Sequence, residues 1–196
     1  CDIPVTITAK NSAHGFTTGN HVFFGGDTVL DNMTLTLTKT SNAIYFSGEG
    51  HDLTIGAGIK TVSNDGSSRF CLSTHKTAGD NGSATLTVMA GNWRNIFVGG
   101  HTGENTGNAT LNMSGGNVNN LVGPTFSGKL TGNTTMNISG GTINVLMAGA
   151  NESGWVKGNT DITVSGGTIS KVRLRRVINS KGIPIYGTVT VKIDGD

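Results

Sequence analysis

The segment that decides the fold is "GNTTMNISGGTIN" at residues 132–144, which alternates small polar and apolar residues and then reaches a Gly-Gly pair. Nearly the same segment occurs as "GNATLNMSGGNVN" at residues 107–119 and as "GNTDITVSGGTIS" at residues 158–170. The glycines that open successive units are almost evenly spaced, with a longer last step, and they are Gly82, Gly107, Gly132, Gly158 and Gly187. Repeats with a period of about 20 to 50 residues are typical of solenoids. The sequence therefore predicts a stack of coils, with one coil per repeat.

Within each unit, apolar residues at every second position predict a β-strand with one buried and one exposed face. The buried row is predicted to contain Leu86, Leu111, Met136, Ile162 and Val191. The alternate positions are mostly threonine and asparagine, which suits an exposed face. A residue without a Cβ can adopt positive φ, so each Gly-Gly pair (115–116, 140–141 and 166–167) is expected to turn a corner. A second strand is expected to follow each corner, with Val118 and Leu121 of one unit pointing inward.

The N-terminal part of the chain is less regular but has similar strand patterns. The segments "DNMTLTLT" at 31–38 and "HDLTIGAG" at 51–58 lie 20 residues apart and share the alternation, so we extend the solenoid through them. "AIYFSG" and "RFCLS" supply further strands. The sequence thus predicts one all-β domain over residues 1–196, with irregular coils at 1–80 and regular repeats at 81–196. We expect an uncapped C-terminal coil and a chain that is a fragment of a longer protein.

The repeats, together with "NMTLTL" and "HDLTIGAG" upstream, resemble the right-handed parallel β-helix of the pectate-lyase-like superfamily. The similarity is to the Gly-, Thr- and Asn-rich coils of secreted bacterial surface proteins and adhesins, and it covers most of the chain as a coil pattern. The resemblance implies a single-stranded right-handed parallel β-helix with about 25 residues per coil, in a protein that is secreted or on a bacterial cell surface. It does not specify an activity, because the superfamily includes lyases, hydrolases, adhesins and structural stalks.

Candidate catalytic carboxylates are scattered through the sequence. A glycosidase site needs two carboxylates that face one sugar bond, and a pectate-lyase-like site needs several calcium-binding carboxylates. The nearest group is Asp27, Asp31 and Asp52, for which turn capping is the simpler interpretation. Asp161 is expected to lie between two threonines, and the five histidines lack a metal-binding spacing. The sequence predicts no catalytic residue, metal or cofactor, and it leaves enzyme activity uncertain.

Charge and hydropathy exclude several classes of partner. The formal net charge is +2, which gives no reason to expect a nucleic-acid partner. No run of about 18 apolar residues is present, so we predict no membrane span in this chain. Two cysteines, Cys1 and Cys71, could form one disulfide bond, although Cys71 is interpreted first as a small buried residue. We expect a monomeric domain.

The segments that return the chain from one coil to the next vary in sequence. They read "GHTGENT" at 100–106, "PTFSGKLT" at 124–131, "ANESGWVK" at 150–157 and "LRRVINSKGIPIY" at 174–186. Register places them along one edge, and insertions on one face of a solenoid often form its binding face. The candidate ligand-binding residues are Trp155, Phe126, Glu104, Lys129, Asn151, Glu152 and Lys157. Alternatively, the two aromatic side chains could simply pack over the edge of the coil.

The leading hypothesis is a non-catalytic adhesin-like or glycan-binding module of an exported bacterial surface protein, with a glycan or a host or cell-surface protein as partner. The alternatives are a polysaccharide lyase or glycoside hydrolase of the pectate-lyase-like group, and a structural stalk. Ice binding by the exposed row Thr85, Thr110 and Thr135 is a further alternative, but Asp161 interrupts that row. Carboxylates about 5 to 9 Å apart would favour an enzyme. A bare polar groove would favour binding or a scaffold.

Overall fold

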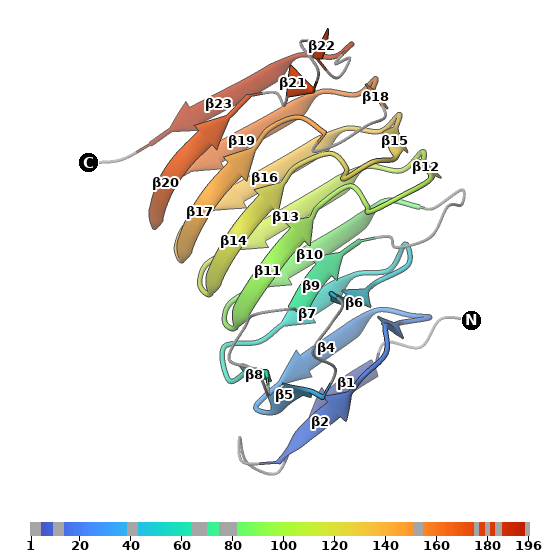
Figure 1. Cartoon of the computed structure of the whole chain (residues 1–196), viewed down its shortest axis with the longest axis vertical. Coiled ribbons are helices and arrows are strands. Elements are labelled where there is room, and N and C mark those ends of the chain that lie inside the picture. Colours follow the sequence, from blue (N-terminus) through green and yellow to red (C-terminus); the bar gives the residue numbers. More distant parts are fainter. Residues whose placement is uncertain are drawn as a thin grey trace.

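The computed structural model of the chain describes residues 5–9, 14–38, 43–63, 70–74, 82–150, 155–174, 177–178, 181–182 and 186–194. The regular structure of these residues consists of β-strands without any helix, so no helix among them could cross a membrane. The strands lie above one another in parallel and form a solenoid (Figure 1). In the regular part, pairing connects equivalent residues of successive repeats, as in Leu86 with Leu111. The predicted all-β parallel solenoid with about 25 residues per coil is confirmed.

The first sheet extends along the whole described solenoid. In spatial order its strands are β1 (Val5–Thr8), β4 (Thr28–Asp31), β7 (Leu53–Ile55), β10 (Ala84–Val88), β13 (Ala109–Met113), β16 (Thr134–Ile138), β19 (Thr160–Val164) and β23 (Val189–Ile193). The predicted row is confirmed, because Leu86, Leu111, Met136, Ile162 and Val191 occupy consecutive rungs. The first four are at most 1% exposed. Val191 is half-buried because it belongs to the last described rung.

The second sheet faces the first across the apolar interior. From the N-terminal end its strands are β3 (Val22–Phe23), β6 (Ile44–Ser47), β9 (Phe70–Ser73), β11 (Asn92–Phe97), β14 (Asn117–Val122), β17 (Thr142–Met147) and β20 (Thr168–Arg173). Val118 and Leu121 of β14 are buried in the main core, as the alternation predicted. The segments "AIYFSG" and "RFCLS" form β6 and β9, which pair with each other. The solenoid therefore includes the irregular N-terminal part.

Two shorter sheets complete the coils at different heights along the axis. The third sheet contains β2 (Gly15–Thr18), β5 (Thr34–Leu37) and β8 (Lys60–Ser63), and the fourth contains β12 (Glu104–Asn105), β15 (Lys129–Leu130) and β18 (Trp155–Val156). Along the chain, the third sheet follows the first, and the fourth sheet precedes it. β21 (Val177–Ile178) and β22 (Lys181–Gly182) form an antiparallel pair. The cross-section of the solenoid therefore changes from its N-terminal to its C-terminal half.

The solenoid extends through residues 31–38 and 51–58, as predicted, but β5 and β7 belong to different sheets. Thr34–Leu37 belongs to the third sheet and pairs with Lys60–Ser63. Leu53 and Ile55 belong to the first sheet, where Leu53 pairs with Thr28 of β4. Both segments alternate with period two because both are half-buried strands. Alternation identifies the faces of a strand, but it does not identify the side of the coil on which the strand lies.

The Gly-Gly corners adopt the predicted conformation. Gly116, Gly141 and Gly167 have φ angles of 86°, 91° and 87°. A Cβ at Gly141 would lie only 2.8 Å from the carbonyl oxygen of Gly116 in the coil below. Stacked corners therefore require glycine for two reasons, the positive φ and the close approach of the neighbouring backbone.

The third sheet ends at β8. In the next coil, the start of β11 occupies the position next to β8. The Asn92 backbone N–H donates to Thr61 Oγ1 at 2.7 Å, so the start of β11 continues from β8. The regular pairing of β11 with β14 skips Arg94 and resumes at Asn95 in the second sheet. Trp93 is 1% exposed, and its indole N–H donates to the Ala90 carbonyl at 2.8 Å. The start of β11 therefore stacks on β8, and its end pairs with β9 in the second sheet.

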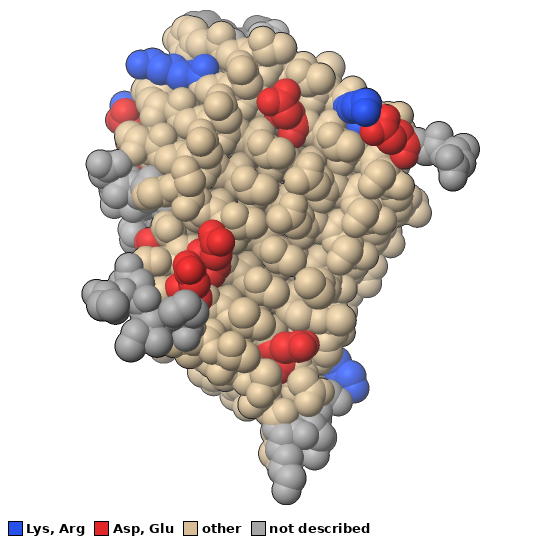
Figure 2. Space-filling view, turned by 180° about the vertical axis from the view of Figure 1, so that it is seen from behind, with Lys and Arg blue, Asp and Glu red and all other residues tan. Residues whose placement is uncertain are grey.

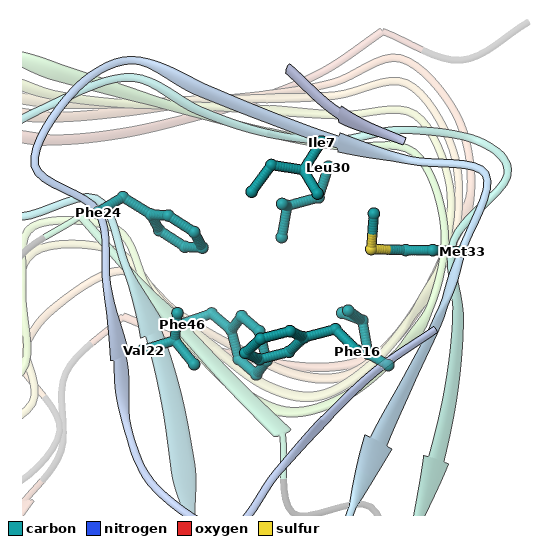
Figure 3. Close-up of a pocket in the computed structure, with 8 residues that line it drawn as sticks. Ile7, Phe16, Val22, Phe24, Leu30, Met33 and Phe46 are labelled. Carbon is teal, nitrogen blue, oxygen red and sulfur yellow. The ribbon is translucent and has the colours of Figure 1, made fainter. Parts of the chain in front are cut away.

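Apolar residues are uncovered at both ends of the solenoid. At the N-terminal end, Ile7 and Phe16 are 43% and 44% exposed, and they line a pocket with Val22, Phe24, Leu30, Met33, Leu35 and Phe46 (Figure 3). At the C-terminal end, Ile193 in β23 is 74% exposed. Residues 186–194 add another rung to the stack, and the uncapped C-terminal coil stays a prediction because part of residues 174–196 lies outside the described residues. Continuation into a longer protein stays a prediction.

Candidate functional site

The return segments bring three of the predicted site residues together on the fourth sheet, with Lys157 directly after its last strand. Glu104 pairs with Lys129, and Lys129 pairs with Trp155, so these three residues lie on consecutive rungs. The alternate positions Asn105, Leu130 and Val156 are at most 1% exposed. Lys157, two residues after Trp155, is exposed. We call Glu104, Lys129, Trp155 and Lys157, together with Tyr186 described next, the edge row.

Tyr186 also belongs to this surface, and it was not among the residues predicted from the sequence. Its backbone N–H donates to the Val156 carbonyl at 2.8 Å, in the same way that the Lys157 N–H donates to Leu130 one coil below at 2.9 Å. Tyr186 therefore lies one rung beyond Lys157, and it is 69% exposed. The last coil contains an insertion, so Tyr186 does not follow the regular spacing. Its alignment with Lys157 could therefore not be predicted from the repeat.

Charged groups surround the indole of Trp155. The ammonium groups of Lys129 and Lys157 lie 5.6 Å and 4.8 Å from the ring centroid, within the range of cation–π attraction. Lys129 Nζ is also 3.6 Å from Glu104 Oε2. Both side chains of that ion pair are about half exposed, so it adds little to stability. The edge row therefore presents the exposed ring of Tyr186, the half-buried indole of Trp155 and charged groups of both signs.

Phe126 does not belong to the edge row. Its ring stacks on His101 at 4.8 Å with an interplanar angle of 7°, and its centroid is 5.1 Å from that of Phe97. Phe97 is 1% exposed and belongs to a second apolar cluster with Tyr45, Cys71, Val122, Val145 and Met147. The Phe126 ring therefore packs over the outer face of the second sheet, which is the alternative considered for this residue from the sequence. Asn151 and Glu152 lie outside the described residues.

The aspartates near the N-terminus bind backbone groups of neighbouring coils. Asp27 Oδ1 accepts from the Asp52 N–H at 3.0 Å, and Asp52 Oδ1 accepts from the Thr85 N–H at 2.7 Å. Asp31 Oδ1 accepts from the backbone N–H groups of Asn32 and Gly58 at 2.8 Å and 2.9 Å. Only the Asp31–Asn32 bond is local, and the other bonds connect neighbouring coils. Within the described part of the chain, no three His, Cys, Asp or Glu side chains form a group that could hold a metal ion.

Cys71 is buried on the outer face of the second sheet. It pairs with Tyr45 on one rung and Asn95 on the next, and Asn95 Nδ2 donates to its Sγ at 3.6 Å. Burial raises the pKa of the Cys71 thiol to about 11, so the thiol is protonated at neutral pH. A protonated buried thiol is a poor nucleophile. The prediction of a small buried residue is confirmed, and Cys1 lies outside the described residues.

The outer face of the first sheet carries the expected polar ladder. Thr85, Thr110 and Thr135 lie on consecutive rungs, and Asp161 follows them in the next rung. In the neighbouring row, Asn137 Nδ2 donates to Asn112 Oδ1 at 2.9 Å. Figure 2, which views the molecule from behind, shows that charged side chains are sparse on this side.

A groove on the outer faces of β11, β14, β17 and β20 was not foreseen. It is lined by Asn92, Trp93, Asn117, Val118, Asn119, Thr142, Asn144 and Ser170, and we call it the asparagine groove. The matching spacing of Asn92 with Asn117, and of Asn119 with Asn144, is visible in the sequence. The hollow itself was not predictable, because it depends on how the chain bends after each corner.

The fold class of the chain follows from its own strand pairing and from the burial of its apolar rows. The pectate-lyase-like resemblance concerns the coil pattern, and it receives no support from similarity to known proteins. No protein-family model matches the chain, and no curated protein or solved structure is significantly similar to it.

Proposed function

We propose that the protein is a non-catalytic, adhesin-like module that binds a glycan or a cell-surface protein through the edge row. The observation that carries the proposal is the alignment of Glu104, Lys129 and Trp155 on consecutive rungs, with Tyr186 one rung beyond Lys157. Exposed aromatic rings with adjacent charged groups are frequent in binding sites, because they combine apolar contact area with orienting polar contacts.

The surroundings of the acidic residues support a binding function over catalysis. Asp27, Asp31 and Asp52 accept hydrogen bonds from backbone N–H groups that hold the coils together. Glu104 is paired with Lys129 on the surface. A glycosidase would require two carboxyl groups placed on either side of one sugar bond.

The proposal includes the right-handed hand of the β-helix, a relationship to the pectate-lyase-like superfamily, and a location outside the cell or on its surface. These features are implied by the resemblance of the coil repeats to secreted bacterial surface proteins. They agree with a solenoid that is rich in glycine, threonine and asparagine and has only 13% charged residues. Export of the full-length protein, followed by fractionation of the producing cells, would test the location.

The test of the edge row is a glycan array with the purified chain, followed by affinity measurements on Trp155→Ala and Tyr186→Ala. We expect each substitution to weaken ligand binding by at least about tenfold, because central aromatic residues carry much of a binding free energy. The control is Phe23→Ala, which removes an aromatic ring that is 50% exposed in the first coil. The control should keep full affinity.

A second arm separates binding from catalysis. Glu104→Gln should retain binding to within a few-fold, because the Glu104–Lys129 ion pair is exposed. Release of reducing ends or unsaturated sugars by the wild-type chain, with loss of that release in Glu104→Gln, would favour the enzyme alternative. Full affinity in both Trp155→Ala and Tyr186→Ala would refute the edge row as the site.

A further inference from the structure

We propose that the asparagine groove is a second binding site, and that its ligand is an extended, uncharged polysaccharide. The groove lies on β11, β14, β17 and β20, whereas the edge row is centred on β12, β15 and β18. The two surfaces belong to different sheets, and the inference does not rest on the function proposed for the edge row.

The shape of the groove suits a chain of sugars. It has an open volume of about 340 Å³, and it adjoins a second hollow with which it shares Asn92 and Asn117. The second hollow is lined by residues 59–62, 89–92 and 116–117, and it forms where the third sheet ends at β8. The groove and the hollow together extend from β8 to β20. Neighbouring strands are about 4.8 Å apart, so the four steps between these strands give a length of about 19 Å. A surface of this length fits several linked sugar units better than one.

The chemistry of the groove matches hydroxyl groups. Asn117 Nδ2 donates to Asn92 Oδ1 at 2.8 Å, and Asn144 Nδ2 donates to Asn119 Oδ1 at 2.8 Å. An amide has two N–H donors and two acceptor lone pairs, and the Asn144–Asn119 bond uses one donor of Asn144 and one lone pair of Asn119. All four side chains are exposed, so a ligand in the groove can reach their amide groups. Sugar hydroxyls both donate and accept, so they can use both halves of an amide.

The paired amides are also held in place before a ligand arrives. Each side chain of a pair is fixed by its partner one rung away, and the backbone beneath it belongs to a sheet with strands on both sides. Binding to side chains that are already ordered costs less conformational entropy than binding to mobile ones. The first sheet has a similar amide pair, Asn112 with Asn137, so the groove differs from that face by combining paired amides with a hollow.

Apolar contacts and charge narrow the ligand class to neutral polysaccharides. Val62 and Met89 in the adjoining hollow are 48% and 42% exposed, and they can pack against the C–H faces of sugar rings. Among the described residues that line the groove and the hollow, Lys60 is the one with a charged side chain. A site for an acidic polysaccharide would need cations spaced along its length.

The experiment measures binding of the whole chain to soluble neutral polysaccharides (a β-glucan, a galactomannan and dextran) and to polygalacturonate, by affinity electrophoresis and calorimetry. The test variant is the double substitution Asn119→Ala and Asn144→Ala. The matched control is Asn112→Ala and Asn137→Ala, which removes an equivalent amide pair from the first sheet. We expect the test variant to bind a neutral polysaccharide about tenfold more weakly, and the control to bind within about twofold of wild type. Thermal unfolding of all variants reports on folding.

Three results would overturn the inference. The first is failure of the wild-type chain to bind any of the three neutral polysaccharides. The second is equal weakening by the test and control variants at equal stability. The third is loss of neutral polysaccharide binding in Trp155→Ala with no loss in the groove variant, which would place the ligand on the edge row and leave the proposed function intact. If the groove variant unfolds, the milder Asn119→Ser with Asn144→Ser gives the same comparison.

Discussion

At the scale of single residues, asparagine side chains of the repeat bind partners one coil away. Asn108 Oδ1 accepts from the Asn133 N–H, and Asn133 Oδ1 accepts from the Asn159 N–H, both at 2.9 Å. By contrast, the side chains of Thr134 and Thr160 are fully buried on neighbouring rungs. Within the described part of the chain, neither hydroxyl has a hydrogen-bond partner. A buried hydroxyl without a partner costs free energy.

Replacement of Thr134 by valine should therefore stabilise the protein by about 1 kcal/mol, because it removes the hydroxyl and keeps the branched shape. The same position is alanine in two earlier coils and Val189 in the last one, so the site accepts an apolar side chain. Urea unfolding measures the change. Thr135→Val, on the exposed face of the same strand, is the control and should stay within about 0.5 kcal/mol of wild type. A loss of stability in Thr134→Val would show that the hydroxyl has a structural role.

At the scale of the strand, stability depends on apolar rows that pass through several coils. Leu111 is fully buried between Leu86 and Met136 of the adjacent rungs. All three belong to one continuous core that both main sheets share. Because stacked backbones have a fixed spacing, the core cannot collapse easily around a missing side chain.

Leu111→Ala should accordingly lower the free energy of unfolding by about 2 to 5 kcal/mol, the range for truncation of buried leucine. Denaturant unfolding of the variant and the wild-type chain gives the difference. Thr110→Ala, its neighbour on the outer face, should change stability by less than about 0.5 kcal/mol. A change of that small size in Leu111→Ala would mean that the row is not part of the core.

At the scale of the molecule, each coil is stabilised by its neighbours, as in other solenoids. β13 has a paired strand on each side, whereas β1 and β23 each pair with one strand. Apolar side chains are also more exposed at the ends than in the centre. The exposed fraction is 0% at Leu111 in the centre, 43% at Ile7 and 74% at Ile193. The central coils should therefore be the most stable part of the chain, and the end coils should open first.

Hydrogen–deuterium exchange followed by mass spectrometry tests this gradient. Backbone amides of β13 and β16 should exchange most slowly, and those of β1 and β23 most rapidly, because local opening requires the loss of fewer contacts at the ends. Peptides from β14 and β17 of the second sheet provide an independent comparison within the same coils. Equal protection of β13 and β23 would contradict a stack that opens from its ends.

The sequence by itself determined the coil period, the inward and outward faces of the regular strands, and the glycine corners. These features are local, since the alternation of Leu111 with its polar neighbours and the Gly-Gly pair at 140–141 depend on strand geometry and on backbone conformation. The repeat then placed Glu104, Lys129 and Trp155 on neighbouring rungs, because equal spacing along the chain becomes adjacency in a stack.

Only the tertiary structure decided which side of the coil each irregular strand occupies. Thr34–Leu37 and Leu53–Ile55 have similar patterns but belong to different sheets, because the third sheet exists only in the N-terminal coils. The structure also separated Phe126 from the edge row, added Tyr186 to it, and formed the asparagine groove. Each of these outcomes depends on contacts between coils, and alternation within one strand carries no information about those contacts.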